Sequence, residues 1–520
     1  MARWHDNYRH RATQTLPLAA KPQSRYTITL LVIFPVYDQA FQLSREGGYV
    51  LSLWLASALL SGVHLLGIWS AIHAAVKVRT SQGAIAWAMG LLLVPYVMLP
   101  LYWVFGRNRF RGYVEVLRQV TEQADHHHPM QSIKSYRATL PAELEHNFGL
   151  LAKLHDTAYT RGNRLELLIN GQQTFDTLFE TIEQAQHYVL IQFFIIHDDE
   201  LGRKFHAALL AKAAQGVKVY LLYDEIGCHA LSRYYLQRLR AGGVAVRSFN
   251  TTRGWRNRFQ LNFRNHRKMV IADGHIALTG GLNVGDEYLG LGKLGYWRDT
   301  FLKLEGPSVQ ALQCSFQSDW YWASRKLITL NNKPKAVGDQ AVLIHATGPT
   351  DKFDACSMMF HQAIIGAKRR LWITSPYFVP SHAVFEVLQL AALRGVDVRI
   401  LLPEKPDHKV VYLASFTFLK AAERAGIKLY RYQRGFLHQK VILVDDDVAS
   451  VGTANLDNRS LYLNFEVTAL VVDKHFAAQV SDMLKDDFTH SRQVSSADLY
   501  SRGLLFRWAV RLARLFDPIL

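Results

Sequence analysis

The chain has 520 residues, of which 49% are hydrophobic and 20% charged, and its formal net charge is +17 at pH 7. This length allows two to four domains with a sizeable core. The three cysteines, Cys228, Cys314 and Cys356, form no CxxC pair, so neither a zinc site nor a disulfide framework is indicated. The positive charge predicts an anionic partner, and nucleic acid and an acidic membrane surface both satisfy it.

The N-terminal region, residues 1–48, contains a basic tail and a short apolar segment, Thr27–Tyr37, which is too short to cross a bilayer. Two uncharged runs follow, Tyr49–Val76 and Ala84–Phe105. Each is long enough to cross a hydrocarbon core of about 30 Å. Residues 49–105 are therefore predicted to form two transmembrane helices rather than two buried core helices.

Basic residues indicate the orientation of these spans. They are denser in the N-terminal tail and at Arg107, Arg109 and Arg111 than in the turn that carries Lys77 and Arg79. The positive-inside rule then places both ends of the membrane region, and everything downstream, in the cytoplasm. Residues 106–155 are predicted to be a charged linker.

From residue 156 onward the pattern alternates between strand and helix. Leu165–Ile169 and Tyr188–Ile196 are predicted strands, and Thr174–Ala185 is a predicted helix with one apolar face. Near-continuous apolar strands between helices are typical of a sheet covered on both faces. Residues 156–330 are therefore predicted to form an α/β/α domain.

Residues 340–495 repeat this order. Gly395–Leu402 resembles Gly216–Tyr223, and Gly426–Leu429 resembles Gly243–Val246. The fold class is therefore α/β, with two copies of one domain related by a pseudo-twofold axis.

The last segment, residues 500–520, is predicted to be a basic amphipathic helix. Its apolar arc consists of Leu504, Leu505, Trp508, Leu512, Leu515 and Phe516, flanked by Arg507, Arg511 and Arg514. This pattern suits a helix that lies in an anionic membrane interface. A helix docked on the domain is the alternative.

The most specific motif is an octet, H-x-K-x4-D, which occurs as His266–Asp273 and again as His438–Asp445. Six residues separate each Asp from a following G-x-x-N, which is Gly280–Asn283 in the first copy and Gly452–Asn455 in the second. Two copies with the same downstream spacing make chance a poor explanation.

Each octet is predicted to be a strand, so residues two apart share a face. His266 then lies beside Lys268, and His438 beside Lys440. Burying these charges without a partner is costly, and a shared anion would relieve that cost.

Across the pseudo-twofold axis the two histidines and two lysines would meet Asn283 and Asn455, which are neutral donors. This set suits a phosphodiester, because lysine and asparagine can balance the phosphoryl oxygens. One histidine can attack phosphorus while the other protonates the leaving alkoxide. No carboxylate cluster suggests a metal, so no metal or other cofactor is expected.

These motifs resemble the phospholipase D superfamily and, within it, the bacterial cardiolipin synthases. The supporting segments are Gly281–Tyr288, Tyr296–Thr300, Ser375–Pro380, Asn455–Ser460 and Asn464–Glu466. The resemblance implies a phosphatidyltransferase of the bacterial inner membrane that joins two phosphatidylglycerol molecules into cardiolipin and glycerol. Its partners would be membrane phospholipids and not nucleic acid.

The resemblance also implies residue roles. His266 would be the nucleophile and His438 the acid and base, although the residues alone leave the two equivalent. Asp299 and Glu466 would orient the histidines. Asp273 and Asp445 complete the catalytic set, as residues that organise the site rather than react.

Substrate binding would involve Gly281 and Thr453, which lie beside the asparagines, in addition to Asn283 and Asn455. Gly281 stands where many members of the superfamily carry serine, and Gln192 stands where several carry an acidic residue.

Four alternative functions share some of these features. A phosphatidylserine synthase or a hydrolytic phospholipase D would differ only in the acceptor. A nuclease would not need the membrane spans. A non-catalytic protein that binds anionic lipid is disfavoured, because both sets of His, Lys and Asn are intact.

Overall fold

The computed structural model describes residues 34–106, 110, 112–115, 132–155, 157–249 and 262–520, with side chains from residue 52 onward. The predicted basic tail therefore lies outside the described residues. The chain divides into two compact units, Met1–Gly67 and Ile68–Leu520. Helix α1 (Phe34–Lys77) contributes to both.

The first predicted span lies within α1. Over the described residues, Ser52–Lys77 is the one helix that is long and apolar enough to cross a membrane. Its 26 residues correspond to about 39 Å at 1.5 Å per residue, which exceeds a hydrocarbon core of about 30 Å. Leu55, Leu59 and Ile72 are exposed along it. The chain thus carries one helix suited to membrane anchoring.

The second predicted span, residues 84–105, is not a single helix. It is divided at Val94 into α2 (Ser81–Leu93) and α3 (Pro95–Phe105). Pro95 has no N–H to donate, and a proline disfavours helical backbone at the residue before it. With 13 and 11 residues, both helices are shorter than the roughly 20 residues that one crossing requires. A two-span hairpin is therefore replaced by one long helix and a short helical hairpin.

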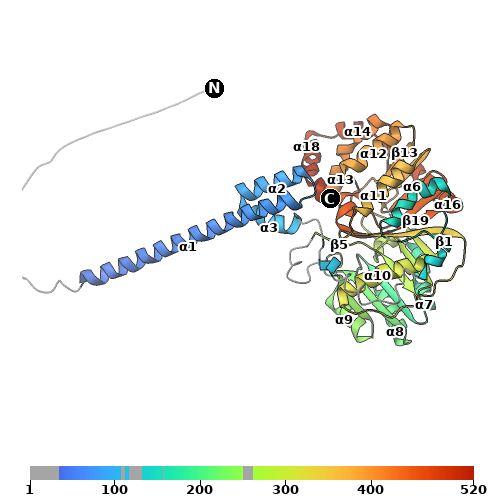
Figure 1. The fold of residues 1–520 in the computed structure, drawn as a ribbon, viewed down its shortest axis with the longest axis horizontal. Helices are drawn as coiled ribbons and strands as arrows, with labels where there is room; N and C mark the ends of the chain where they lie inside the picture. The colour runs from blue at the N-terminus through green and yellow to red at the C-terminus, as the bar shows by residue number, and fades with distance from the viewer. Residues whose placement is uncertain (1–33, 107–109, 111, 116–131, 156, 250–261) are drawn as a thin grey trace, which may run out of the picture. The chain divides into compact units, whose positions relative to one another are not determined.

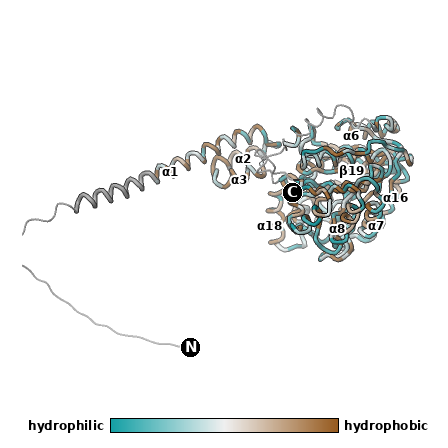
Figure 2. Tube along the Cα trace, turned by 90° about the horizontal axis from the view of Figure 1, so that it is seen from below, coloured by the Kyte–Doolittle hydropathy of each residue, from teal (hydrophilic) through white to brown (hydrophobic). Residues whose placement is uncertain are grey.

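The hairpin folds back beside the end of α1 (Figure 1). The rings of Trp87 and Tyr102 lie 5.3 Å apart, and the Tyr102 hydroxyl and His73 Nδ1 form a hydrogen bond of 2.7 Å. Figure 2 shows that hydrophobic residues dominate α2 and α3. In the turn between α1 and α2, Arg79 Nη2 donates to Asp354 Oδ1 at 2.8 Å. The C-terminal end of α1 therefore contacts the α/β part of the molecule.

The α/β part is built on a 16-stranded mixed sheet that contains the two repeats (Figure 1). The first repeat has the order β1-β9-β7-β6-β2-β3-β4, and the second has the corresponding order β10-β19-β17-β16-β11-β13-β14. The equivalent strands β1 and β10 pair antiparallel at the centre, which relates the repeats by an approximate twofold axis. The duplicated α/β architecture is thus confirmed.

The strands of the first repeat are β1 (Thr160–Ile169), β2 (Tyr188–Phe193), β3 (Lys218–Asp224), β4 (Ala245–Phe249), β6 (Met269–Ala272), β7 (Ile276–Gly280) and β9 (Thr300–Glu305). Those of the second are β10 (Gln340–Thr347), β11 (Arg370–Thr374), β13 (Asp397–Pro403), β14 (Lys428–Tyr432), β16 (Val441–Val444), β17 (Val448–Gly452) and β19 (Asn464–Val472). At the edge, β20 (Ser491–Val494) pairs with β14.

Helices cover both faces of the sheet. Three of them pack on one face of the first repeat, namely α7 (Asn170–Gln184), α8 (Glu200–Ala214) and α9 (Arg233–Ala241). Their counterparts on the second are α11 (Ala355–Gly366), α12 (His382–Leu393) and α14 (Leu419–Ala425). The other face is covered by α10 (Ser308–Ser324) and α16 (Lys474–Thr489).

The core beneath α10 and α16 is shared. It joins Leu302 and Phe316 of the first repeat with Val467 and Val480 of the second in one buried cluster. Because apolar burial in this cluster depends on both repeats, each stabilises the other.

Candidate active site

The two octets occupy equivalent central positions. β6 pairs with β2 and β7, and β16 pairs with β11 and β17. Directly before β6, Lys268 Nζ donates to the carbonyl of His266 at 2.8 Å, and before β16 Lys440 makes the same bond to His438. All four side chains are buried. Each lysine thus lies close to its histidine, although the strands themselves begin only at Met269 and Val441, so each octet is a strand only in its second half.

One short parallel strand pair attaches each octet to the other repeat. β5 (Arg264–Asn265) pairs with the start of β19, and β15 (Phe436–Leu437) pairs with β8 (Trp297–Arg298). The ladders continue into the octets, where His266 N donates to the Phe465 carbonyl at 2.9 Å and His438 N donates to the Arg298 carbonyl at 2.8 Å. These pairings assemble one site from both repeats.

The orienting carboxylates cross between the repeats. His266 Nδ1 lies 2.9 Å from Oε2 of Glu466, which belongs to the second repeat. His438 Nδ1 lies 2.6 Å from Oδ2 of Asp299, which belongs to the first. A carboxylate at Nδ1 directs the other ring nitrogen, Nε2, away from it. Both imidazoles therefore have Nε2 available for substrate.

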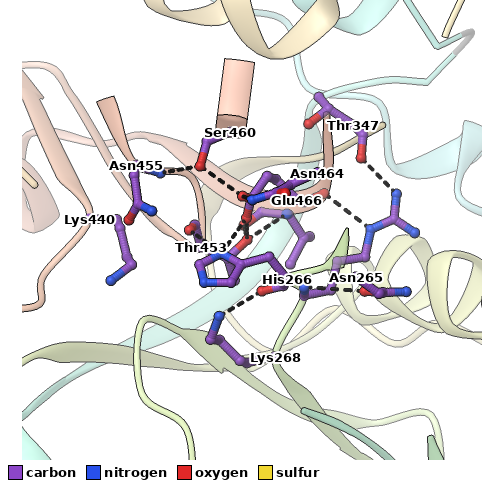
Figure 3. Close-up of polar contacts among 12 residues, drawn as sticks. Asn265, His266, Lys268, Thr347, Lys440, Thr453, Asn455, Ser460, Asn464 and Glu466 are labelled. Atoms are coloured by element: carbon purple, nitrogen blue, oxygen red, sulfur yellow. Dashed lines mark hydrogen bonds and ion pairs between the residues drawn. The ribbon is translucent and has the colours of Figure 1, made fainter. Parts of the chain in front are cut away.

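Glu466 lies in a dense set of donors (Figure 3). Its Oε1 accepts from Ser460 Oγ at 2.9 Å and from Asn464 Nδ2 at 3.0 Å, and its Oε2 accepts from Thr453 Oγ1 at 2.5 Å. Burial alone would raise the pKa of Glu466, but the interactions with His266, Lys268 and Thr453 outweigh it and hold the pKa below its usual value. Glu466 is thus an ionised acceptor for the histidine N–H.

Asp299 has fewer donors. Besides His438, it accepts one backbone hydrogen bond, from Thr300 N at 2.7 Å. Burial raises the pKa of Asp299 to about 7, against the opposing influence of Lys440, Lys268 and the Thr300 N–H. Near neutral pH both the ionised and the protonated form of Asp299 are therefore populated, in contrast to Glu466.

The cationic groups converge on one space. Figure 3 shows Lys268, Lys440 and Asn455 in the surroundings of the His266 ring, and both lysines act electrostatically on both histidines. Burial lowers the pKa of His266 to about 4 and that of Lys440 to about 8. Burial and the two lysines lower the pKa of His438, and burial lowers that of Lys268 well below its usual value. A bound anion would favour the protonated forms of all four groups.

The two predicted asparagines lie in the turns after β7 and β17. Asn283 Oδ1 accepts from Ile195 N at 3.1 Å, and its Nδ2 faces the Tyr288 hydroxyl at 3.3 Å. Asn455 Nδ2 donates to Asp457 Oδ2 at 3.2 Å. The Asn455 Oδ1 is buried and has no hydrogen-bond partner among the described residues.

Gly281 and Thr453 are equivalent positions with different consequences. A Cβ at Gly281 would lie 2.0 Å from Asp299 Oδ1, so a serine there would displace that carboxylate. At the matching position the Thr453 hydroxyl donates to Glu466. The first half therefore has no hydroxyl at position 281, because the Asp299 carboxylate occupies the space that a serine side chain would need.

Aromatic side chains lie beside both histidines, and none of them had a predicted role in the site. The Phe194 ring lies 5.0 Å from the His266 ring, and the Trp297 ring lies 5.2 Å from the His438 ring. The Tyr288 hydroxyl lies 3.4 Å from His438 Nδ1. Tyr288 and Trp297 belong to segments that carry the family resemblance, which was the only signal for them. Phe194 had no such signal.

A buried network supports the first octet. Arg267 donates to Asp319 at 2.9 and 3.0 Å and to the Glu466 carbonyl at 3.1 Å. Gln192 donates to Asp319 and to Asn265, at 2.8 Å in each case. Gln192 is thus a structural residue of this network.

Asp273 and Asp445 do not belong to the site, which corrects their inclusion in the catalytic set. Each lies at the far end of its strand, roughly 20 Å of extended chain from its histidine. Asp273 accepts from the backbone N–H groups of residues 186–188, and Asp445 accepts from those of residues 368–370. Both have positive φ, of 53° and 51°. Their carboxylates bind the backbone of the loops that lead into β2 and β11. They therefore stabilise the sheet and do not contact the substrate.

No group of three or more His, Cys, Asp or Glu side chains in the described part of the chain is placed to hold a metal ion. That the reaction needs no cofactor stays a prediction.

Comparison with known proteins gives consistent matches. The family described as "Cardiolipin synthase, PLD-like domain" matches residues 178–320 and 360–488. Cardiolipin synthase A of Pseudomonas putida strain F1 is 51% identical over 472 residues, which cover 89% of this chain and 98% of that protein. The protein of the same name from P. putida strain W619 is 49% identical over 483 residues, which cover 91% and 98%.

Among solved structures, phosphatidylserine synthase of Haemophilus influenzae Rd KW20 matches with a TM-score of 0.55 at 15% identity. The match covers 68% of this chain and 95% of that one. At this identity the likeness concerns the fold alone.

Proposed function

The chain belongs to the cardiolipin synthase family of phospholipase D-like proteins, and on that basis we propose that it transfers a phosphatidyl group between two phosphatidylglycerol molecules, giving cardiolipin and glycerol. The observation that carries the proposal is the crossing of Glu466 and Asp299, which leaves two Nε2 atoms and two lysines in one buried site. Two histidines that act in sequence on one phosphorus fit a transfer through a covalent intermediate.

In the first step, His266 Nε2 attacks the phosphorus of one phosphatidylglycerol. The bond from phosphorus to the glycerol headgroup breaks, and the His438 imidazolium donates its proton to the leaving alkoxide. Lys268 and Lys440 balance the charge of the phosphoryl oxygens. The anionic phosphate also favours the protonated state of His438, which burial alone opposes.

In the second step, neutral His438 takes the proton from a terminal hydroxyl of a second phosphatidylglycerol. That oxygen attacks phosphorus, and the bond between phosphorus and His266 breaks. The products are cardiolipin and free His266. After the second step His438 is again protonated and His266 is again free, so the site has returned to its starting state.

The donors around Glu466 favour His266 as the nucleophile. A phosphorylated histidine carries positive charge on its ring, which an ionised carboxylate at Nδ1 stabilises. The pKa of Glu466 is held low, whereas that of Asp299 is raised to about 7. His438, beside the acid that titrates near neutrality, suits the proton-transfer role.

The direct test supplies purified protein in phosphatidylglycerol micelles without metal or nucleotide. We expect cardiolipin and free glycerol in equal amounts. Cardiolipin that forms only with CDP-diacylglycerol would contradict the proposal. Phosphatidic acid as the sole product would indicate a hydrolytic phospholipase D, and phosphatidylserine formed from added serine would indicate a serine acceptor.

We place the protein in the bacterial cytoplasmic membrane with its α/β part on the cytoplasmic side, because Arg107, Arg109 and Arg111 follow α3. Arg79 contacts Asp354, so the C-terminal end of α1 lies on the same side as the α/β part. In this arrangement α1 crosses once, and the α2–α3 hairpin enters the bilayer from the cytoplasmic side. The basic N-terminal tail then lies on the opposite side of the membrane, which differs from the two-span prediction that placed both ends in the cytoplasm.

Single cysteines test this topology with a membrane-impermeant maleimide applied to intact cells. We expect Ser24→Cys to be labelled from outside and Ser81→Cys to be protected. The reverse result would mean that residues 84–105 form a second full crossing, as the hydropathy of the sequence predicts.

A further inference from the structure

The C-terminal helix α18 (Leu504–Ala513) has a defined orientation on the second repeat. Val510 and Ala513 are buried, and the Phe506 ring packs edge-to-face on Phe416 with 5.1 Å between centroids. The following turn, η5 (Arg514–Ile519), continues from it to the chain end. These contacts determine which side of the helix faces outward.

The outward side is the apolar arc. Leu505 is 88% exposed, Leu515 74% and Trp508 58%, and the remaining members are at least half exposed. Helix α18 is therefore docked on the domain, as the alternative expected, but through Phe506, Val510 and Ala513 rather than through the arc. A contiguous exposed apolar surface of this kind marks an interaction site rather than ordinary solvent exposure.

Beside the arc lies a cleft of about 660 Å³ with a basic lining. Arg507, Arg511 and Arg514 line it from α18 and η5, and Tyr500 and Thr417 line it from neighbouring segments. Spacings of four and three place the arginines on one helical face. The lining includes no carboxylate.

The arginines are arranged to receive an anion. The Arg507 guanidinium lies 5.5 Å from the Tyr500 ring centroid, and that of Arg511 lies 5.0 Å from the Trp508 centroid. Such contacts orient a guanidinium and leave its N–H groups able to donate. Planar N–H donors match the geometry of phosphate oxygens.

We propose that this cleft binds the phosphate of an anionic phospholipid in the bilayer while the apolar arc of α18 enters the acyl region beside it. Figures 1 and 2 both place α18 and the C-terminus at the end of the α/β part that also carries α2 and α3. Helix α18 thus lies on the same side of the α/β part as α2 and α3. A soluble phosphate or a nucleic acid would account for the arginines but not for the apolar arc.

The proposed headgroup site is separate from the catalytic site but attached to it. Leu520 O accepts from Arg459 N at 2.8 Å, and Asn458 Nδ2 donates to Asp517 O at 2.9 Å. Asn458 and Arg459 belong to α15 (Asn458–Tyr462), whose Ser460 donates to Glu466. A lipid held by α18 therefore fixes the catalytic face against the bilayer surface.

The test uses full-length protein with His266→Ala, so that the result does not depend on turnover or on the proposed reaction. Leu505→Cys carries an environment-sensitive fluorophore in a chain that also carries Cys314→Ser, because Cys314 is partly exposed, whereas Cys228 and Cys356 are buried. In neutral detergent micelles, added phosphatidylglycerol should shift the emission to shorter wavelength. Replacing Arg507, Arg511 and Arg514 by Gln should raise the half-saturating lipid fraction about a hundredfold. Each arginine contributes a factor of about five, and the three factors multiply.

The matched control replaces Arg233, Arg238 and Arg240, three exposed arginines of α9, by Gln and should leave the titration unchanged. Phosphatidylcholine and inorganic phosphate should not reproduce the shift. An equal response of the α18 variant and its parent, or an equal response to phosphatidylcholine, overturns the proposal. A response to phosphate alone, or to a short oligonucleotide, would overturn it in favour of that ligand.

Discussion

The two halves of the active site share one strand order but hold their histidines differently. Glu466, which holds His266, has three side-chain donors besides the histidine, whereas Asp299, which holds His438, has a single backbone donor. Burial is nearly complete in both cases. The difference teaches that duplication of a motif does not give two equivalent histidines. The interaction with His266 lowers the pKa of Glu466 most, and Lys268 and Thr453 add to it, whereas the groups around Asp299 do not outweigh the effect of burial on its pKa.

The largest expected effect separates the two histidines. His266→Ala should lower kcat by at least about 10⁴-fold, because it removes the nucleophile. His438→Ala should lose about 10²–10⁴-fold with phosphatidylglycerol, but far less with a phosphatidyl ester of p-nitrophenol, whose leaving group needs no proton. Rapid-quench kinetics with both substrates measures this. If His266→Ala were the variant rescued by the nitrophenyl ester, the assignment of the two histidines would be reversed.

The orienting carboxylates should give the next largest difference. Glu466→Gln should lower kcat by about 10³-fold, because an amide can neither hold the Nδ1 proton in the same way nor stabilise a phosphorylated ring. Asp299→Asn should cost about tenfold less, since Asp299 already titrates near pH 7. Acid-quench trapping of phosphohistidine provides the readout. Equal losses in the two variants would mean that the donors around Glu466 have no catalytic consequence.

Thr453 and Gly281 test the environment of each carboxylate. Thr453→Val should lower kcat by about 10- to 100-fold through loss of a charge-assisted hydrogen bond, and Thr453→Ser should restore most of it. Gly281→Ser should displace Asp299 and weaken the His438 half selectively. The p-nitrophenyl substrate distinguishes them, since it should spare Gly281→Ser but not Thr453→Val. The same pattern in both variants would argue against independent halves.

The smallest effect concerns the lysines. Burial lowers the pKa of Lys440 to about 8, and a lowered lysine pKa means that the charge is lost as the pH rises through that value. We expect kcat/KM to fall above about pH 8. Bound phosphate favours the charged lysine, so the corresponding limb of kcat should lie at higher pH. Identical limbs in both profiles would show that Lys440 does not contact the phosphate.

Much of the site was accessible from the sequence, since the paired octets, the G-x-x-N turns and the two orienting acids all lie in local motifs. The partner of each acid was not, because β5–β19 and β15–β8 pair segments from different repeats. Asp273 illustrates another limit. Strand alternation predicts the side on which a residue lies, but seven residues of extended chain remove it from the site.

The membrane region shows the same division. Hydropathy alone identified two apolar runs, and the length of α1 agrees with the first. The second apolar run contains Pro95. A proline there is compatible either with a kinked helix that continues or with a complete reversal of the chain direction. Packing of Tyr102 against Trp87 and His73 determines that the chain reverses.

The sequence by itself therefore determined the duplicated α/β class, the chemical composition of the site and the presence of an apolar anchor, because each depends on residue type and short-range spacing. Only the tertiary structure decided which carboxylate serves which histidine, where the second apolar run turns, and that the arc of α18 faces outward. These depend on contacts between segments far apart in the chain, and short-range patterns carry no information about such contacts.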